Sequence, residues 1–237
     1  DLGWNAFGCY GSRFYQTPTI DSLAHAGVLF TDGYAACTVS SPTRAALMTG
    51  KYPARLHLTD WIAGWNYPWA KLRIPEWTKY LPLEEKTVAE YLKDSGYQTW
   101  HVGKWHLGDD EKYWPENQGF DVNIGGNYKG APIKNKEGCN GYFSPYCLPR
   151  LENGEEGEYL TDRLTNEAER LIEKQGDRPF FLNMSHYAVH TPLGAKPELE
   201  RKYEALADSS YFHNNATYAA MIQSVDESLN RILEVLK

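Results

Sequence analysis

The segment from Ser40 to Gly50, SSPTRAALMTG, combines hydroxyl groups with a cation at the expected start of a helix. Pro42 suits the first turn of a helix that ends at Gly50, so Ser40 would lie just before the helix N-terminus. Arg44 follows Ser40 by about one helical turn, and a helix N-terminus together with a guanidinium group attracts an anion. The simpler interpretation is that Ser40 or Ser41 only caps the helix.

The complete segment is more specific than a helix cap, because it resembles the signature of the type I sulfatases. That signature reads Ser or Cys, any residue, Pro, any residue, Arg, and then a short run that ends in Thr-Gly. In this family the first residue is oxidised after translation to formylglycine, whose hydrate is the nucleophile. The resemblance places this residue at Ser40. It makes the protein similar to serine-type members, which are characteristically bacterial and are matured by radical-SAM enzymes.

Three further segments resemble motifs of the same family and follow in the expected order. The first four residues, DLGW, resemble the end of an Asp-Asp metal motif. Residues 103–108, GKWHLG, resemble the second signature, and residues 186–192, HYAVHTP, resemble a segment that supplies a further catalytic histidine. The resemblance covers essentially the whole chain, and four specific motifs in the correct order do not agree by chance.

The resemblance implies a role for each motif residue. Arg44 would pair with the oxygens of the nucleophile, and Lys104 would place a positive charge on the sulfate. His106 would orient or deprotonate the diol, and His190 would protonate the leaving oxygen. The structural alternatives are surface salt bridges for the two cations and hydrogen-bonded core histidines for the two imidazoles.

A divalent cation, Ca²⁺ by resemblance, is also expected, since hard oxygen ligands suit it. Asp1 and Ser40 are the residues of this chain that would ligate it, and the alternative for Asp1 is an ordinary solvated acid. The family has a later strand that ends in an Asp-Asn or Asp-His metal pair, followed by another sulfate-binding Lys. No such segment follows residues 180–182. We therefore expect residues 1–237 to form the N-terminal part of the catalytic domain, without the second metal motif and a small C-terminal subdomain.

Helical and extended segments alternate along the chain, which predicts an α/β fold. Expected helices cover 17–26, 42–48, 87–94, 161–174 and 218–236, and expected strands cover 28–30, 97–102 and 180–184. Thr87 and Glu90 match a capping box, and the apolar run at 180–184 is typical of a buried central strand. The resemblance specifies an alkaline-phosphatase-like sulfatase fold, with a central mixed sheet and helices on both faces, truncated on its C-terminal side.

Two stretches interrupt the alternation and are predicted to be long loops, which are often functional. The stretch from Gly125 to Gly157 is rich in Gly, Asn and Pro, whereas Arg55 to Tyr80 holds four of the eight tryptophans. Aromatic rings suit a carbohydrate ligand, and covering the sheet is an equally good explanation for them. In this aromatic loop His57, Asp60 and Trp61 are candidates for substrate contact.

Composition excludes several classes of protein. Lys+Arg 24 and Asp+Glu 31 give a net charge of −7, which argues against a nucleic-acid partner. No apolar run approaches the ~18 residues of a membrane span. Cys139 and Cys147 are close enough in sequence to pair in an oxidising compartment, but two unpaired thiols are equally consistent with their spacing.

The predicted function is the hydrolysis of sulfate monoesters, on a sulfated carbohydrate such as a galactose or N-acetylgalactosamine sulfate. One alternative is a phosphate ester or phosphonate hydrolase of the same superfamily, which needs a similar cationic site. A second is a catalytically dead relic that only binds carbohydrate. The bacterial resemblance predicts a periplasmic or secreted protein whose signal peptide lies outside this sequence. Its expected partners are a sulfated glycan and a radical-SAM maturation enzyme.

Overall fold

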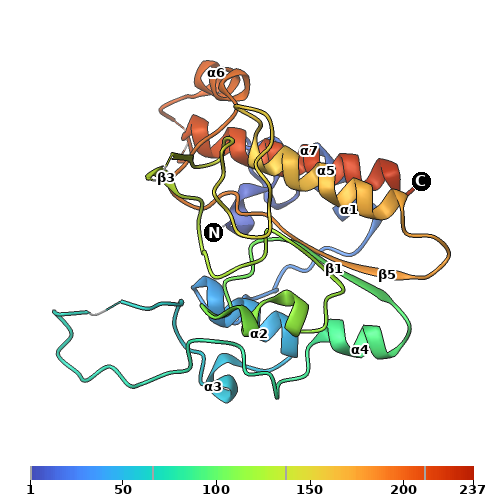
Figure 1. The fold of residues 1–237 in the computed structure, drawn as a ribbon. Helices are drawn as coiled ribbons and strands as arrows, with labels where there is room; N and C mark the ends of the chain where they lie inside the picture. The colour runs from blue at the N-terminus through green and yellow to red at the C-terminus, as the bar shows by residue number, and fades with distance from the viewer. Residues whose placement is uncertain (1, 66, 137, 211) are drawn as a thin grey trace. The chain divides into compact units, whose positions relative to one another are not determined.

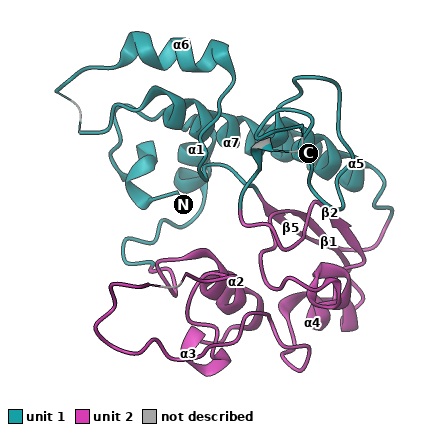
Figure 2. Ribbon diagram, turned by 60° about the vertical axis from the view of Figure 1, so that its left-hand side comes forward, with its two compact units in different colours: residues 1–33, 131–176, 186–237 teal, residues 34–130, 177–185 magenta. Residues whose placement is uncertain are grey.

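The computed structural model describes residues 2–65, 67–136, 138–210 and 212–237 (Figure 1). The chain forms two compact units, which Figure 2 shows in different colours. Unit 1 consists of Asp1–Gly33, Ala131–Gly176 and His186–Lys237, and unit 2 of Tyr34–Gly130 and Asp177–Ser185.

The structure contains both helices and strands, including all five helices and two of the three strands that the sequence pattern predicts. The α-helices are α1 Pro18–Ala26, α2 Ser40–Thr49, α3 Pro53–Leu56, α4 Val88–Asp94, α5 Leu160–Glu173, α6 Pro197–Leu206 and α7 Ala216–Val235. The strands are β1 Gln98–Gly103, β2 Val122–Ile124, β3 Lys134–Lys136, β4 Cys139–Asn140 and β5 Phe180–Ser185. Short 3₁₀ helices lie at Trp4–Ala6, Gly8–Tyr10, Glu111–Tyr113 and Pro115–Asn117. The α/β expectation is confirmed.

Unit 2 is built around a parallel sheet with the strand order β2-β1-β5. Trp100 of β1 pairs with Val122 of β2 and with Leu182 of β5, so β1 is the central strand of the three. Five of the six residues of β1 are buried, whereas all six of β5 are half-buried. The prediction of a strand at 180–184 is confirmed, and among the described strands of this sheet β5 is half-buried and pairs with β1 alone.

Two other expectations differ from the structure. Residues 28–30 form no strand, and Val28 and Phe30 are largely exposed. A β-rich triplet does not become a strand without a hydrogen-bonding neighbour, and the described residues supply none here. In addition, the predicted loop at 125–157 contains the antiparallel pair β3-β4. The resemblance specified a mixed sheet, but the three described strands of the sheet in unit 2 are all parallel. The antiparallel strands β3 and β4 form a separate pair.

Local sequence signals explain where the helices of unit 2 begin and end. Thr87 and Glu90 form the predicted capping box at the start of α4, which contacts β1. Gly50 ends α2 in the left-handed conformation, with φ 67°. The apolar side of α2, Ala45 and Met48, belongs to a buried cluster whose other members come from the segments 56–89 and 105–120: Leu56, Leu58, Ile62, Leu81, Ala89, Trp105, Leu107 and Phe120. This cluster anchors α2 beside the end of β1.

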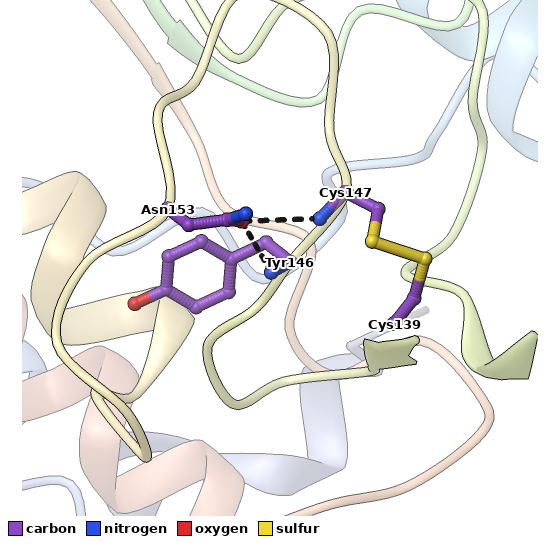
Figure 3. The surroundings of a disulfide bond; sticks show 4 residues. All are labelled: Cys139, Tyr146, Cys147 and Asn153. Atoms are coloured by element: carbon purple, nitrogen blue, oxygen red, sulfur yellow. Dashed lines mark hydrogen bonds between the residues drawn. A yellow bond between two sulfur atoms is a disulfide. The ribbon is translucent and has the colours of Figure 1, made fainter. Parts of the chain in front are cut away.

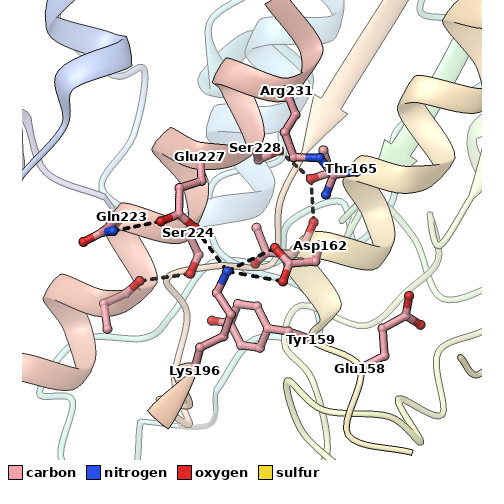
Figure 4. A network of polar contacts seen from close by, with 12 residues as sticks. Glu158, Tyr159, Asp162, Thr165, Lys196, Gln223, Ser224, Glu227, Ser228 and Arg231 are labelled. Carbon is pink, nitrogen blue, oxygen red and sulfur yellow. Dashed lines mark hydrogen bonds and ion pairs between the residues drawn. The ribbon is translucent and has the colours of Figure 1, made fainter. Parts of the chain in front are cut away.

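Unit 1 is organised around α7, which contacts α1, α5 and α6. Asp226 of α7 is buried and accepts the backbone N–H groups of Thr19 and Ile20, so its carboxylate caps the N-terminus of α1. Figure 4 shows the polar contacts between α5 and α7, in which Lys196 pairs with Asp162 and Glu227. These contacts join segments that are far apart in the sequence.

Cys139 and Cys147 form a disulfide in unit 1 (Figure 3). The side chain of Asn153 accepts the backbone N–H groups of Tyr146 and Cys147 at 2.8 and 3.3 Å, which holds the second half of the loop. Cys9 and Cys37 are not bonded to another cysteine. The structure therefore selects the paired alternative that the spacing left open.

Across the part of the chain that the structure describes, no helix has both the length and the apolar character that crossing a membrane would require.

Candidate active site

Ser40 is the first residue of α2, and Val39 before it has an extended backbone. The start of the helix thus lies two residues earlier than Pro42 suggested, which is within the ordinary uncertainty of a helix boundary. Ser41 does not act as a free cap, because its hydroxyl accepts the backbone N–H of Ile62 at 3.0 Å. Ser40 instead directs its Oγ toward two functional side chains.

The first of these is Arg44, one turn further along α2. Its Nε donates to Ser40 Oγ at 2.9 Å, and its Nη1 donates to the backbone carbonyl of Lys104 at 2.8 Å. The guanidinium group therefore links the start of α2 to the residue that follows β1. Residues at i and i+4 lie on one face of a helix, which is why the sequence spacing predicted this contact.

The second is His106, whose Nδ1 lies 3.3 Å from Ser40 Oγ. Its Nε2 is hydrogen-bonded to the carbonyl oxygen of Ile62. Because a carbonyl only accepts, Nε2 carries the proton, and Nδ1 of the neutral ring accepts from the Ser40 hydroxyl. The ring is therefore oriented to take a proton from the group at position 40.

Two backbone features hold His106 in this orientation. His106 has a φ of 63°, a left-handed conformation that is uncommon for a residue other than glycine and is characteristic of functional sites. Gly130 lies against its ring, because a Cβ at position 130 would be 2.4 Å from His106 Cε1. A residue with a side chain at position 130 would displace the ring or the loop.

Lys104 directly follows β1, and its backbone N–H donates to Ser185 at the end of β5. The carboxyl ends of parallel strands are the usual place for ligand-binding residues in α/β sheets. Its side chain is only 1% exposed. Burial, and to a smaller extent the neighbouring Arg44, lowers the pKa of Lys104 to about 7. A buried cation of this kind is stabilised when an anion binds beside it.

Ser40, Arg44, Lys104 and His106, hereafter the Ser40 cluster, thus come together in unit 2 as the motifs predicted. The cluster offers one hydroxyl, one imidazole acceptor and two cationic groups. This combination suits nucleophilic attack on an anionic ester.

His190 belongs to unit 1. Its Nδ1–H donates to the carbonyl of Thr191 at 2.6 Å, which leaves Nε2 as the nitrogen that can exchange a proton with a ligand. The hydroxyl of Tyr142 donates to the carbonyls of Tyr187 and His190, both at 2.8 Å, and so holds the turn that carries His190. The role of His190 as leaving-group acid stays a prediction.

The predicted metal ligands do not make a complete site within the described residues. Asp1 lies outside those residues, and Ser40 Oγ is hydrogen-bonded to Arg44 and His106. In the described ranges no group of three or more His, Cys, Asp or Glu side chains is arranged to hold a metal ion. The donors that are present do not fit a cation by themselves, so no chemical step below depends on one.

The aromatic loop is partly structural. Asp60 accepts the backbone N–H of Trp61 at 2.8 Å and the hydroxyl of Tyr67 at 3.2 Å, so it organises the loop. Trp77 packs on the buried cluster of unit 2, whereas Trp69 is 68% exposed. His57 is exposed and has a φ of 52°. Contact of His57, Asp60 or Trp61 with substrate stays a prediction.

Sequence reasoning did not identify three of the positioning groups. The carbonyl of Ile62, the hydroxyl of Ser41 and the bare Cα of Gly130 all orient the Ser40 cluster. The first is a backbone group in a long loop, which no side-chain pattern reveals. The only available signal was the proximity of position 62 to Trp61, already a candidate.

Comparison with known proteins identifies relatives over the whole chain. The family described as Sulfatase matches residues 1–237. Human N-acetylgalactosamine-6-sulfatase is 32% identical over 251 residues, which cover 100% of this chain and 45% of the relative. Human arylsulfatase A is 35% identical over 219 residues, which cover 81% of this chain and 40% of the relative.

A solved structure confirms the fold. The crystal structure of Ps i-CgsB in complex with k-i-k-neocarrahexaose matches with a TM-score of 0.77 and 30% identity. It covers 100% of this chain and 52% of that protein. The chain therefore has the alkaline-phosphatase-like sulfatase fold and spans about half the length of the relatives it matches.

Proposed function

Because the chain belongs to the sulfatase family, we propose that the intact protein hydrolyses sulfate monoesters through a formylglycine hydrate made from Ser40. The observation that carries this proposal is the Ser40 cluster. Ser40 Oγ lies at hydrogen-bonding distance from both Arg44 and His106, and Lys104 follows the central strand beside them. The family match explains why these residue types occur together.

Formylglycine hydrate at position 40 would supply a geminal diol, with one hydroxyl for attack on sulfur and a second whose deprotonation would allow sulfate to be expelled. His106 is placed to accept the proton of the attacking hydroxyl at Nδ1. Arg44 and Lys104 stabilise the negative charge on the sulfate oxygens. His190 gives a proton to the oxygen of the leaving alcohol as the S–O bond breaks. Addition of water restores the hydrate, so the sum of the steps is one ester and one water giving one alcohol and one sulfate.

The maturation of Ser40 is the first test. Conversion to formylglycine removes two hydrogens, so the tryptic peptide from Phe14 to Arg44 should become lighter by about 2 Da. Expression without a radical-SAM maturase should leave the serine intact and give folded protein with very little activity. If fully active protein contains only unmodified Ser40, the formylglycine mechanism fails, and direct serine attack on a phosphate ester becomes the better explanation.

The choice between sulfate and phosphate esters is the second test. The two reactions need similar cationic sites, so kcat/KM should be measured for both esters of the same alcohol with matured protein. We expect the sulfate ester to be preferred. A preference of more than about tenfold for the phosphate ester, or about 1.4 kcal/mol, would contradict the proposal. Binding of sulfated sugar without any turnover by matured protein would support the catalytically dead alternative.

We further propose that the substrate is a sulfated polysaccharide containing galactose or N-acetylgalactosamine sulfates. The supporting observations are the neocarrahexaose complex of Ps i-CgsB, the name of the human N-acetylgalactosamine-6-sulfatase and the exposed aromatic residues of the loop at 55–80. A screen of matured protein against defined sulfated oligosaccharides should show sulfate release from one regiochemistry of one of these sugars. Release only from glucosamine or uronic acid sulfates would contradict this assignment.

The disulfide supports a proposal about compartment. Disulfides persist in oxidising environments, and Cys139 is joined to Cys147. We propose that the protein is exported to the bacterial periplasm or secreted after a radical-SAM enzyme has acted on Ser40. Fractionation of the native cells, with an activity assay of each fraction, tests this. Activity confined to the cytoplasmic fraction would contradict it.

A further inference from the structure

Unit 1 contains a concave site that is separate from the residues of the Ser40 cluster. Its cavity volume is about 240 Å³, which is smaller than the roughly 300–1,000 Å³ of pockets for drug-sized ligands and suits a single sugar ring. The N-terminal segment and the residues before α7 form its walls. The lining residues that matter here are Trp4, Asn5, Tyr10, Arg13, Phe212 and His213, and we name the site the Trp4 pocket.

The Trp4 pocket has unusually exposed aromatic rings. Trp4 is 68% exposed and Phe212 is 93% exposed. The ring of Trp4 is held edge-to-face against Tyr10, with centroids 6.1 Å apart, so one ring face is fixed in place. Exposed aromatic surface at a concave site is typical of a place where a ligand binds.

The same pocket has a fixed polar pair. Asn5 Nδ2 lies 3.0 Å from His213 Nε2, so the amide donates and this nitrogen of the imidazole accepts. The His213 ring also packs against Tyr15 and Phe212, with centroids 5.5 and 4.8 Å away. The second N–H and the carbonyl oxygen of the Asn5 amide can bind hydroxyl groups of a ligand without a change in this arrangement.

Arg13 adds a positive charge to the pocket. Its side chain is exposed, and no ion pair with a carboxylate is found for it in the part of the chain that the structure describes. A guanidinium group binds tetrahedral oxyanions through two parallel hydrogen bonds. The pocket thus combines aromatic faces, an amide and a cation, which is the chemistry of a sulfated pyranose and not of a neutral lipid or an apolar peptide.

We propose that the Trp4 pocket binds a sulfated sugar residue of the glycan, with Trp4 and Phe212 against the ring and Arg13 on its sulfate. This inference deepens the proposed function and rests on it for the class of ligand. The site would add affinity for the polymer, whereas cleavage occurs at the Ser40 cluster.

The test uses the intact protein with Ser40→Ala, so that the ligand is not consumed. Titration calorimetry would measure binding of a sulfated neocarrahexaose, a chondroitin 6-sulfate hexasaccharide, their desulfated forms and inorganic sulfate. We expect Arg13→Gln to weaken binding of the preferred sulfated oligosaccharide by about tenfold and to leave binding of its desulfated form unchanged. Trp4→Ala should weaken both forms. Arg201→Gln, which removes another exposed arginine of unit 1 outside the pocket, is the matched control and should bind like the parent protein.

The same substitutions in matured protein with Ser40 intact separate the two proposals. Hydrolysis of 4-nitrophenyl sulfate, which contains no sugar for the Trp4 pocket to bind, should proceed at the parent rate in Arg13→Gln. If the parent protein does not hydrolyse this ester or any sulfated sugar, the proposed function fails. If it does, and Arg13→Gln and Trp4→Ala both bind the oligosaccharides like the parent, the Trp4 pocket is not a glycan site. The inference is also overturned if the parent protein binds neither oligosaccharide. The same holds if the substitutions weaken the binding of inorganic sulfate but not that of the oligosaccharides.

Discussion

At the scale of single residues, the orientation of His106 decides what the Ser40 cluster can do. Its Nε2 is hydrogen-bonded to the carbonyl of Ile62, so Nδ1 is the nitrogen available to the Ser40 hydroxyl. The other tautomer of the neutral ring would present a proton where an acceptor is needed. The carbonyl of a loop residue thus controls which nitrogen of His106 faces the nucleophile without a proton.

Gly130→Ala tests this orientation. A Cβ at position 130 would be 2.4 Å from His106 Cε1, so the ring must move away from Ser40. We expect kcat of matured protein to fall by about tenfold to a hundredfold while the thermal unfolding midpoint changes little. Gly33→Ala, whose new Cβ would be 3.6 Å from its nearest neighbour, is the control. Equal activity in both variants would show that Gly130 does not position the ring.

Lys104→Gln tests the role of the buried cation. Burial lowers the pKa of Lys104 to about 7, so its positive charge in the free protein is complete only below that pH. We expect kcat/KM of the parent protein to fall as pH rises through about 7, and Lys104→Gln to lose turnover strongly and to lose this pH dependence. The variant should remain folded by circular dichroism, and unfolding would favour a structural role for Lys104.

His190→Ala tests the proposed leaving-group acid. An alcohol of high pKa needs a proton as the S–O bond breaks, whereas an activated aryl group leaves almost without help. We therefore expect a much greater loss of kcat/KM for an alkyl or sugar sulfate than for 4-nitrophenyl sulfate. Equal losses for the two substrates would assign the acid to another residue.

At the scale of elements, β1 contributes both a functional group and a buried ionisable one. Lys104 follows its carboxyl end, and His101 within it is fully buried. His101 Nε2–H donates to the Gly103 carbonyl, and Nδ1 accepts from the Asn183 amide, both at 3.0 Å. The neutral ring is fully hydrogen-bonded and joins β1 to β5. This arrangement gives His101 a structural role.

His101 should make the stability of the protein sensitive to acid. Burial lowers its pKa from 6.5 to about 3, so between these values the unfolded chain binds more protons than the folded one. The free energy of unfolding should therefore fall as pH drops from about 6.5 towards 3, with a contribution of about 1.4 kcal/mol per pH unit. In His101→Gln this part of the slope should disappear from urea unfolding curves recorded at pH 4 to 7. An unchanged slope would assign the acid sensitivity to other groups.

At the scale of the whole molecule, the two compact units divide the candidate functional residues between them. The Ser40 cluster lies in unit 2, and His190 and the Trp4 pocket lie in unit 1. Unit 1 also contains the disulfide, which closes a loop with a sequence separation of 8. Its stability is therefore expected to depend on the redox state of the compartment.

Reduction of the disulfide gives a prediction for the intact protein. Restricting a loop of this size in the unfolded chain stabilises the folded state by about 2–3 kcal/mol in the chain-entropy description. The double variant Cys139→Ser and Cys147→Ser should lose this amount in denaturant unfolding, and a reducing agent should then have no further effect. Cys9→Ser, at a cysteine without a disulfide partner, is the control. Equal stability of parent and double variant would contradict a structural role for the bond.

The sequence alone determined most of what depends on local chemistry. The helix starting near Ser40, the capping box of Thr87 and Glu90 and the amphipathic α7 all form as the residue patterns predict. The contact of Ser40 with Arg44 follows from helical periodicity alone. The four motifs identified the family because they are specific combinations of residue types, which can be recognised in the sequence without a structure.

Tertiary structure decided what depends on contacts between distant segments. The sequence singled out 180–184 as the central strand, whereas the strand order shows that β1 lies between the other two described strands of the parallel sheet. Residues 28–30 form no strand, although their residue types favour one. The pairing of Cys139 with Cys147 was one of two equal alternatives in the sequence. His106 meets Ile62 and Gly130 through loop backbones, which carry no side-chain signal. A residue pattern records the preferences of neighbours in the chain, whereas register, strand order and loop contacts arise only when the chain packs.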